Sequence, residues 1–463
     1  MVSFWVYDVA FLILFSLGIF WFLRRRRDEL SREGLIFMWR TQFGVEAIGW
    51  FAKKFSGILN RIKYLVIGVG VVLMGAMVWM LCQTTSIYIL HSKEIVEKMA
   101  APPIAPLIPY FPKLFGMESY FPPFYFTYFI VALAIVAIVH EFSHGIFMRL
   151  FRVKIKSTGL VFLGPILGAF VEEEKSGFHK KGKLKQMTVL GAGVFANVLV
   201  ALLFYLFYVL FFLSSFTSSG YIFDSYGMTA VPLENITGFE DVGNLTKVLT
   251  ESENYYLDDN LAVQLTEVNG DYLIAYIEAP AILAEMKGAI VRANDVEILN
   301  VDSLREFMES QSPGDRVHFV TEDISTPHQI YEYDVVLGQH PEDSSRAYLG
   351  VGNNVANPRG FIQNFLVKFM SFKSSSTYYT PTWDGEFVDF ILYLLWWVMV
   401  INLLVALFNM LPLGMLDGGR FFYLAVLGIF GSERIAKGAY KAATYLILFM
   451  FALMMFFWFV RII

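Results

Sequence analysis

The sequence predicts a polytopic α-helical membrane protein with a separate water-soluble domain. Of its 463 residues, 56% are hydrophobic and only 17% are charged, which is far more apolar than an ordinary soluble domain. The apolar residues gather in long runs toward both ends of the chain, and the middle is polar. A pair of histidines lies inside one of the apolar runs. These observations predict a membrane bundle in two halves, with a polar site inside it and a soluble domain between the halves.

Six apolar runs are long enough to cross a bilayer, which takes about 20 residues. They lie at 4–23, 64–90, 125–150, 187–213, 387–411 and 442–460. The first run lacks the basic start and the small-residue cleavage site of a secretory signal, so we favour a retained anchor over a cleaved signal. A further apolar run at 415–429 is too short to span, and the basic segment 431–441 reads as a connector. The sequence therefore predicts about six spans.

Basic residues next to these runs predict their orientation. Four arginines at 24–27 follow the first run, and Arg61 and Lys63 precede the second. The fourth run is preceded by five lysines, Lys175, Lys180, Lys181, Lys183 and Lys185. The positive-inside rule places these clusters in the cytoplasm, which puts both termini and the polar block 215–384 outside. Two glycosylation sequons, at Asn235 and Asn244, fall in that block and agree with this assignment.

The segment 155–171 is predicted to form a bent β-hairpin rather than a helix. Gly159, Gly164, Pro165 and Gly168 interrupt β-branched and large apolar residues there. Lipid cannot satisfy the backbone of a hairpin at membrane depth, so such a hairpin must be covered by protein or line a cavity. We therefore expect a membrane-reentrant β-hairpin with an edge strand beside an active site.

Charge and cysteine content exclude several classes of protein. The net charge of −5 is small, and the basic residues cluster beside membrane runs, so nucleic acid is not an expected partner. The single cysteine, Cys82, excludes an intrachain disulfide framework and a thiolate metal cage. The lipid bilayer is the partner that composition predicts.

The third apolar run contains His140-Glu141-Phe-Ser-His144. Residues four apart share one face of a helix, so both imidazoles could bind one zinc ion, with Glu141 beside it as a base. Such a motif also arises by chance in soluble proteins. Inside a membrane span each charged residue costs about 2.5 to 3.5 kcal/mol on insertion scales, so ionisable groups there favour the metal interpretation.

A catalytic zinc ion usually has three protein ligands and one open position, which requires a third ligand. Asp417 follows the fifth run, where Pro412 and the pair Gly418-Gly419 interrupt the helix. The alternative is a helix cap or an interfacial charge paired with Arg420. The third and fifth runs both pass from outside to inside, so the two motifs lie at similar depth near the cytoplasmic side. Zinc there would lower the pKa of a bound water toward 7, Glu141 would take the proton, and a peptide bond would be hydrolysed.

These motifs resemble the site-two protease family of intramembrane zinc metalloproteases. Leu416-Asp417-Gly418 matches the family's second metal motif, Asn409 and Pro412 match its N-x-x-P element, and Gly193 to Asn197 matches G-x-x-x-N. The resemblance implies one catalytic zinc ion held by His140, His144 and Asp417, with Glu141 as the catalytic base. It also implies reentrant strands that present an unwound substrate by strand addition.

The resemblance further implies a substrate class and a location. The substrates would be the transmembrane segments of single-span membrane proteins, cut in regulated intramembrane proteolysis after a first protease has removed an external domain. The protein would be a multi-pass protein of the cell membrane, with its active site toward the cytoplasmic side. A catalytically silent scaffold that binds partners through its external domain is the alternative. A metalloprotease that cuts at a soluble face would need a further soluble ligand, and none stands out.

The polar block resembles a PDZ domain in its core, 279–321, with a helix at 303–308 and a turn at Pro313-Gly314-Asp315. A recognisable carboxylate-binding loop is missing and 246–276 does not align, so a generic β-rich domain is the alternative. The predicted organisation is two N-terminal helices with an external loop (1–123), the first half of the protease core (124–214), an extracytoplasmic α+β PDZ-like domain (215–360), a linker (361–386) and the second half of the core (387–463).

Three further features have two interpretations each. Asn197 and Asn409 could bind substrate or stabilise an oxyanion, and interhelical packing bonds are the alternative. The acidic residues 172–174 are expected to be a solvated run rather than a second metal site.

Overall fold

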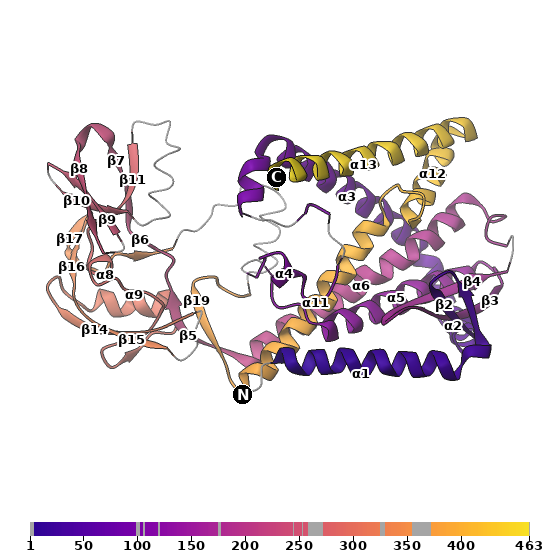
Figure 1. The fold of residues 1–463 in the computed structure, drawn as a ribbon, viewed down its shortest axis with the longest axis horizontal. Helices are drawn as coiled ribbons and strands as arrows, with labels where there is room; N and C mark the ends of the chain where they lie inside the picture. Colours follow the sequence, from indigo (N-terminus) through magenta and orange to yellow (C-terminus); the bar gives the residue numbers. More distant parts are fainter. Residues whose placement is uncertain are drawn as a thin grey trace. The chain divides into compact units, whose positions relative to one another are not determined.

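A computed structural model describes residues 4–98, 102–104, 107–118, 121–174, 177–243, 245–251, 253–257, 272–324, 329–353 and 372–462. The chain forms two compact units, Met1–Phe212 with Glu386–Ile463, and Leu213–Gly385 (Figure 1). Lys175, Asn244 and much of the predicted linker 361–386 lie outside the described residues. The assignment of each predicted domain therefore stays a prediction.

Six helices in the described part of the chain are long and apolar enough to cross a membrane, which supports a polytopic membrane protein. They are α1 (Phe4–Arg25), α3 (Ser56–Lys98), α5 (Phe126–Leu150), α6 (Lys183–Ser215), α11 (Gly385–Asn409) and α13 (Glu433–Ile462). Each matches one predicted run. The segment 431–441, predicted as a connector, is helical from Glu433 onward, because α13 begins there and runs on into the apolar residues 442–460. Its cytoplasmic position stays a prediction. α3 likewise begins before its apolar run.

The unit made of Met1–Phe212 and Glu386–Ile463, called the membrane unit below, contains a four-stranded antiparallel sheet with the order β1-β2-β3-β4. Its strands are β1 (Leu30–Glu33), β2 (Ile36–Thr41), β3 (Ile155–Leu163) and β4 (Ile166–Glu173). The predicted hairpin corresponds to β3 and β4, which turn at Gly164 with φ +59. β1 and β2 were not predicted from the sequence, and their pairing with β3 leaves β4 as the outer strand of the hairpin. Reentry of this hairpin into a membrane stays a prediction.

The core of the membrane unit surrounds α5. Helix α2 (Phe43–Lys54) packs across α5, and its Ile48 is fully buried. A Cβ atom on Gly145 would lie 2.6 Å from Ile48 Cδ1, so the glycine lets the two helices approach. A second apolar cluster, rich in aromatic residues, includes Tyr128 on α5 and Trp397 on α11. The short helices α4 (Phe111–Leu114) and α12 (Asp417–Phe430) complete this unit. Packing on several sides therefore holds α5 in place.

The second unit contains two main antiparallel sheets. The five-stranded sheet has the order β7-β11-β10-β9-β8, and the six-stranded sheet joins β15-β14-β12-β5-β19, with β13 beside β12. Two further pairs are β16-β17 and β18-β6. The strands are β5 (Phe216–Ile222), β6 (Ser225–Tyr226), β7 (Met228–Pro232), β8 (Ile236–Val242), β9 (Leu245–Thr250), β10 (Asn254–Leu257), β11 (Tyr272–Ile277), β12 (Ala289–Ala293), β13 (Val296–Glu297), β14 (Arg316–Glu322), β15 (Ile330–Val336), β16 (Gly338–His340), β17 (Asp343–Tyr348), β18 (Val351–Gly352) and β19 (Thr377–Pro381).

Two helices, α8 (Pro280–Leu283) and α9 (Val301–Glu309), accompany these strands. The predicted helix at 303–308 lies in α9, and the strand expected after Pro313-Gly314-Asp315 is β14. The unit therefore contains both helices and strands, and its likeness to a PDZ domain stays a prediction.

A buried aspartate joins α1 to the start of α5. Asp8 is 1% exposed, and its carboxylate accepts hydrogen bonds from the backbone N–H groups of Phe126 (2.8 Å) and Thr127 (2.9 Å). The hydroxyl groups of Thr127 (2.6 Å) and Tyr110 (2.5 Å) also donate to it. Asp8 therefore caps α5 from a neighbouring helix, where the helix's own N-cap residue makes no side-chain bond.

We predict that Asp8→Ala lowers the free energy of unfolding by about 2 kcal/mol, because it leaves buried donors unpaired. Thermal unfolding of the full chain in detergent measures the loss. Tyr110→Phe removes only one donor and should cost about 1 kcal/mol, which makes it the matched control. A melting temperature unchanged by Asp8→Ala would contradict the capping role.

Candidate metal centre

Helix α5 carries the first two candidate ligands. His140 and His144 are 8% and 7% exposed, and they point from one face of the helix because they are four residues apart. Glu141 lies beside them on the same turn. Apolar residues occupy most of the rest of α5, so the two imidazoles form an isolated polar site within it.

Asp417 is the first residue of α12, and tight backbone packing brings it to the histidines. α11 ends at Asn409, and a loop through Pro412 leads into α12. A Cβ atom on Gly418 would lie 2.3 Å from the carbonyl carbon of Met410, and one on Gly419 would lie 2.1 Å from the Leu413 oxygen. Only glycine fits at both positions, so the Leu-Asp-Gly-Gly sequence lets α12 begin against this loop.

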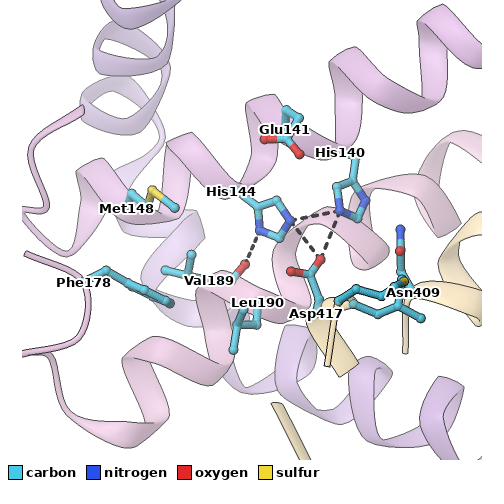
Figure 2. Close-up of a pocket in the computed structure, with 11 residues that line it drawn as sticks. His140, Glu141, His144, Met148, Phe178, Val189, Leu190, Asn409 and Asp417 are labelled. Carbon is cyan, nitrogen blue, oxygen red and sulfur yellow. Dashed lines mark hydrogen bonds and ion pairs between the residues drawn. The ribbon is translucent and has the colours of Figure 1, made fainter. Parts of the chain in front are cut away.

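The three side chains meet at their polar atoms (Figure 2). Asp417 Oδ2 lies 3.1 Å from His140 Nε2 and 3.1 Å from His144 Nε2, and the two Nε2 atoms are 3.0 Å apart. Zinc bonds of 2.0–2.1 Å in a tetrahedral site place ligand atoms about 3.3 Å apart, so this triangle is close to the size that zinc requires. Two imidazoles and one carboxylate are also a donor set that zinc accepts.

The outer nitrogen of each imidazole has a partner that orients the ring. His144 Nδ1 donates to the Val189 carbonyl oxygen at 2.7 Å, which leaves Nε2 with a free lone pair. Asn197 Nδ2 lies 3.1 Å from His140 Nδ1. Asn197 Oδ1 is buried and has no hydrogen-bond partner among the described residues. A half-turn of the amide would let that oxygen accept the Nδ1 proton of His140, which leaves its Nε2 free for metal.

Gly193 of α6 lies directly against both rings. A Cβ atom at this position would be 2.6 Å from His140 Cε1 and 2.6 Å from His144 Nε2. The first residue of the Gly-x-x-x-Asn element therefore provides room for the imidazoles, and Asn197, one helical turn later, contacts His140. This close approach explains why a glycine and an asparagine are needed four residues apart.

Glu141 and Asn409 line the same cavity as the three candidate ligands, and its volume is about 360 Å³. The lining residues are His140, Glu141, His144, Met148, Phe178, Val189, Leu190, Asn409, Met415, Leu416 and Asp417. Glu141 Oε2 also accepts a hydrogen bond from the backbone N–H of Val171 on β4 at 3.1 Å. The candidate base therefore links the cavity to the outer strand of the sheet.

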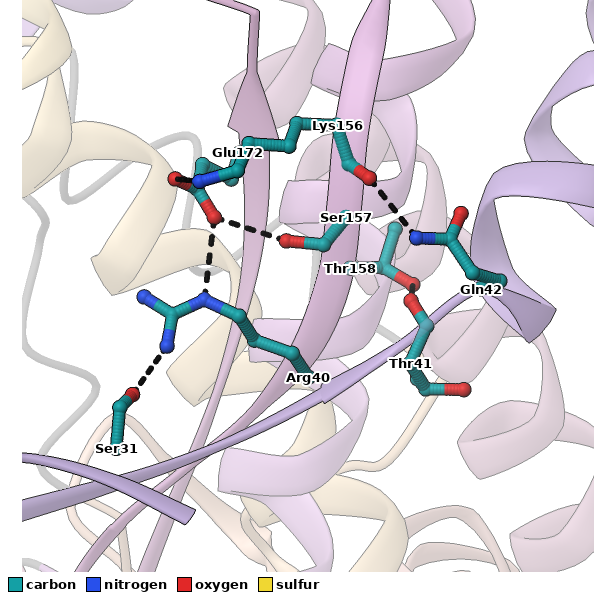
Figure 3. Close-up of polar contacts among 8 residues, drawn as sticks. All are labelled: Ser31, Arg40, Thr41, Gln42, Lys156, Ser157, Thr158 and Glu172. Atoms are coloured by element: carbon teal, nitrogen blue, oxygen red, sulfur yellow. Dashed lines mark hydrogen bonds and ion pairs between the residues drawn. The ribbon is translucent and has the colours of Figure 1, made fainter. Parts of the chain in front are cut away.

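The acidic residues at the end of β4 each have a partner of their own. Figure 3 shows Glu172 bonded to Lys156 (2.7 Å), Ser157 (2.9 Å) and Arg40 (3.2 Å). The hydrogen bond from Lys156, with that from Ser157, lowers the pKa of Glu172 from 4.5 to about 2. The carboxylate thus stabilises the sheet fully above pH 4.5, and the stabilisation is lost as the pH falls through about 2. Glu173 accepts from the Phe178 N–H, and Glu174 pairs with Lys154.

Five of the six predicted site residues line one cavity, and the sixth, Asn197, lies behind His140. The described side chains form one metal-type cluster, His140, His144 and Asp417, so nothing there supports a second site at 172–174. Arg420, the alternative partner of Asp417, donates to Gln186 at 2.8 Å instead. Val189 was not predicted from the sequence, because a backbone carbonyl that orients a histidine leaves no sequence signal. Substrate binding by Asn197 and Asn409 stays a prediction.

Helices that could span a membrane, together with a buried His-His-Asp cluster, define a membrane metallopeptidase type of protein. The chain belongs to Peptidase family M50, whose sequence model matches residues 128–455, and this confirms the resemblance to site-two proteases. Peptidases of this family are zinc metalloproteases. An uncharacterized protein of Methanocaldococcus jannaschii is 43% identical over 74 residues, which are 16% of this chain and 20% of that protein. The match thus spans about a fifth of that curated relative.

We predict that Gly193→Ala weakens zinc binding by about 10- to 100-fold, the range typical for a disturbed ligand environment. The added methyl group overlaps both imidazoles and must push one of them away. Zinc content after dialysis against graded chelator measures the effect. Gly428→Ala on α12 is the matched control, since a Cβ atom there meets nothing within 4 Å. Equal zinc retention in the two variants would contradict the assignment.

Proposed function

We propose that this chain is an intramembrane zinc metalloendopeptidase that hydrolyses peptide bonds within the transmembrane segments of single-span membrane proteins. The observation that carries the proposal is the buried cluster of His140, His144 and Asp417 in one cavity with Glu141. Family membership supports a metallopeptidase, and the six apolar helices support action in a membrane. The activity would serve regulated intramembrane proteolysis, after another protease has shortened the substrate.

The residues divide the chemistry among themselves. His140, His144 and Asp417 would hold one zinc ion, which, when bound, polarises a water molecule and lowers its pKa toward 7. Glu141 lines the cavity next to this site and would take the proton of the attacking water as general base. The N–H of Val171 donates to the same carboxylate and fixes its position. Asn409 could donate to the substrate from the cavity wall.

The outer strand β4 supports a way to present the substrate. The Val171 N–H points to Glu141 and not to β3, and N–H groups two residues apart on a strand point the same way. The N–H groups of Leu167 and Ala169 therefore face the same open edge, where no described strand pairs. A substrate segment in extended form could add to this edge, which exposes carbonyl groups that a helix would shield.

The orientation of the protein follows from its charges. Basic clusters at the end of α1 and around the starts of α3 and α6 support cytoplasmic placement of those ends. The cavity would then lie in the membrane toward the cytoplasm, and the second unit would be an extracytoplasmic PDZ-like domain that screens substrates by size. The alternative, a silent scaffold, would keep this fold without turnover.

Cleavage of tagged single-span substrates by the full chain in detergent tests the proposal. We predict that Glu141→Gln keeps its zinc but loses at least about 100-fold in rate, which is the lower range of general-base catalysis. Glu174→Gln, a carboxylate outside the cavity, should cut normally and serves as control. Product masses should place the cut inside the apolar segment.

Two outcomes would contradict parts of this proposal. Cut sites outside the apolar segment would exclude intramembrane cleavage. Wild-type protein that neither carries zinc nor cuts any substrate would favour the scaffold.

Ala169→Pro tests strand addition separately. Proline removes an N–H that faces the open edge and breaks no bond to β3, so the sheet should stay intact. We predict strongly reduced cleavage with unchanged zinc content and melting temperature. Ala169→Val keeps the N–H and should remain active. Normal cleavage by the proline variant would exclude substrate pairing at this position.

A further inference from the structure

A second cavity in the membrane unit, of about 590 Å³, lies apart from the metal centre. It opens where the start of α3, the end of α5 and the start of α6 meet. We call it the basic cavity, and its lining residues are Asn60, Lys63, Tyr64, Ile67, Leu150, Phe151, Arg152, Lys181, Leu184, Lys185 and Thr188. None of these residues lines the cavity at the metal centre.

Among the described residues, four cations from three parts of the chain line the basic cavity and no acidic residue does. Lys63, Arg152, Lys181 and Lys185 form no ion pair with any described carboxylate. The ammonium group of Lys181 donates to a neutral acceptor, the Arg152 carbonyl oxygen, at 3.4 Å. The positive end of the α6 dipole adds to this field. A cleft lined by one sign of charge concentrates ions of the opposite sign, so the cavity favours an anion.

An apolar recess of about 340 Å³ continues along the same helices. Its lining is apolar except for Ser143 and consists of Phe51, Leu59, Ile62, Ile138, Val139, Phe142, Ser143, Ile146, Phe147, Ala192, Phe195, Ala196 and Leu199. On α6, Leu184 and Thr188 line the basic cavity, and Ala192 and Ala196 line the apolar recess. Residues four apart lie on one face of a helix, so the two sites follow each other along one face of α6.

We propose that the basic cavity binds the phosphate headgroup of an anionic phospholipid whose acyl chain lies in the apolar recess. An anionic head and an apolar tail match the charge of one site and the lining of the other. In the predicted orientation the basic cavity lies at the cytoplasmic surface, where basic pockets between helices meet anionic headgroups. Free phosphate would use the basic cavity alone, so the apolar recess favours the lipid.

Lipid binding to the full chain in neutral detergent tests this proposal. Phosphatidylglycerol and phosphatidylcholine with identical acyl chains are titrated, and native mass spectrometry counts the lipids retained. We expect one phosphatidylglycerol per chain to bind at least tenfold more tightly than phosphatidylcholine. Replacing three of the cations together, by Lys63→Gln, Lys181→Gln and Lys185→Gln, should reduce the preference for phosphatidylglycerol over phosphatidylcholine at least tenfold.

The matched control removes the same number of positive charges from lysines that do not line the basic cavity, by Lys53→Gln, Lys180→Gln and Lys441→Gln. It should keep the wild-type preference. Ala196→Phe fills the apolar recess and should weaken the binding of phosphatidylglycerol. Inorganic phosphate should still compete for the basic cavity of this variant as it does in the wild type. Equal binding of both lipids by the wild type, or an unchanged preference in the cavity variant, would overturn the proposal. Full competition by phosphate with no effect of Ala196→Phe would show an anion site and overturn the lipid assignment.

Discussion

The contact of two imidazoles and one carboxylate inside apolar helices is the interaction on which the rest of this structure depends. A charged group within a span costs about 2.5 to 3.5 kcal/mol on insertion scales, so ionisable residues such as His140 and His144 in α5 are tolerable there only with polar partners. Asp417, at the start of α12, is such a partner and lies 3.1 Å from both imidazoles. Their meeting requires unusually close backbones. Gly193 makes room for the rings, and Gly418 and Gly419 allow α12 to start against the preceding loop. The small residues and the ligands are therefore parts of one arrangement.

The sheet is coupled to this centre through a single side chain. Glu141 lies in the cavity and accepts a hydrogen bond from the Val171 N–H. This bond holds the candidate base against the open edge of β4. Glu172, the next residue, joins β4 to Arg40 on β2 and Lys156 on β3. β2 and β3 thus hold the strand whose open edge would receive the substrate.

Hydropathy and motif spacing predicted the parts of the structure that have strong local signals. Six candidate spans followed from apolar runs, and the candidate ligands followed from four-residue spacing and a broken helix at Pro412. Strands β1 and β2 were missed because a six-residue strand beside basic residues has no distinctive pattern. Asp8 was missed because its partners lie more than a hundred residues away. Likewise, the role of Asn197 behind His140 depends on two helices meeting, which local sequence does not encode.

X-ray absorption at the zinc edge of the purified full chain tests the central claim most directly. One zinc ion per chain with two imidazole nitrogens and one carboxylate oxygen in its first shell, and the loss of that oxygen scatterer in Asp417→Ala, is the result this account predicts. A spectrum that lacks imidazole scattering, or one that Asp417→Ala leaves unchanged, would contradict it.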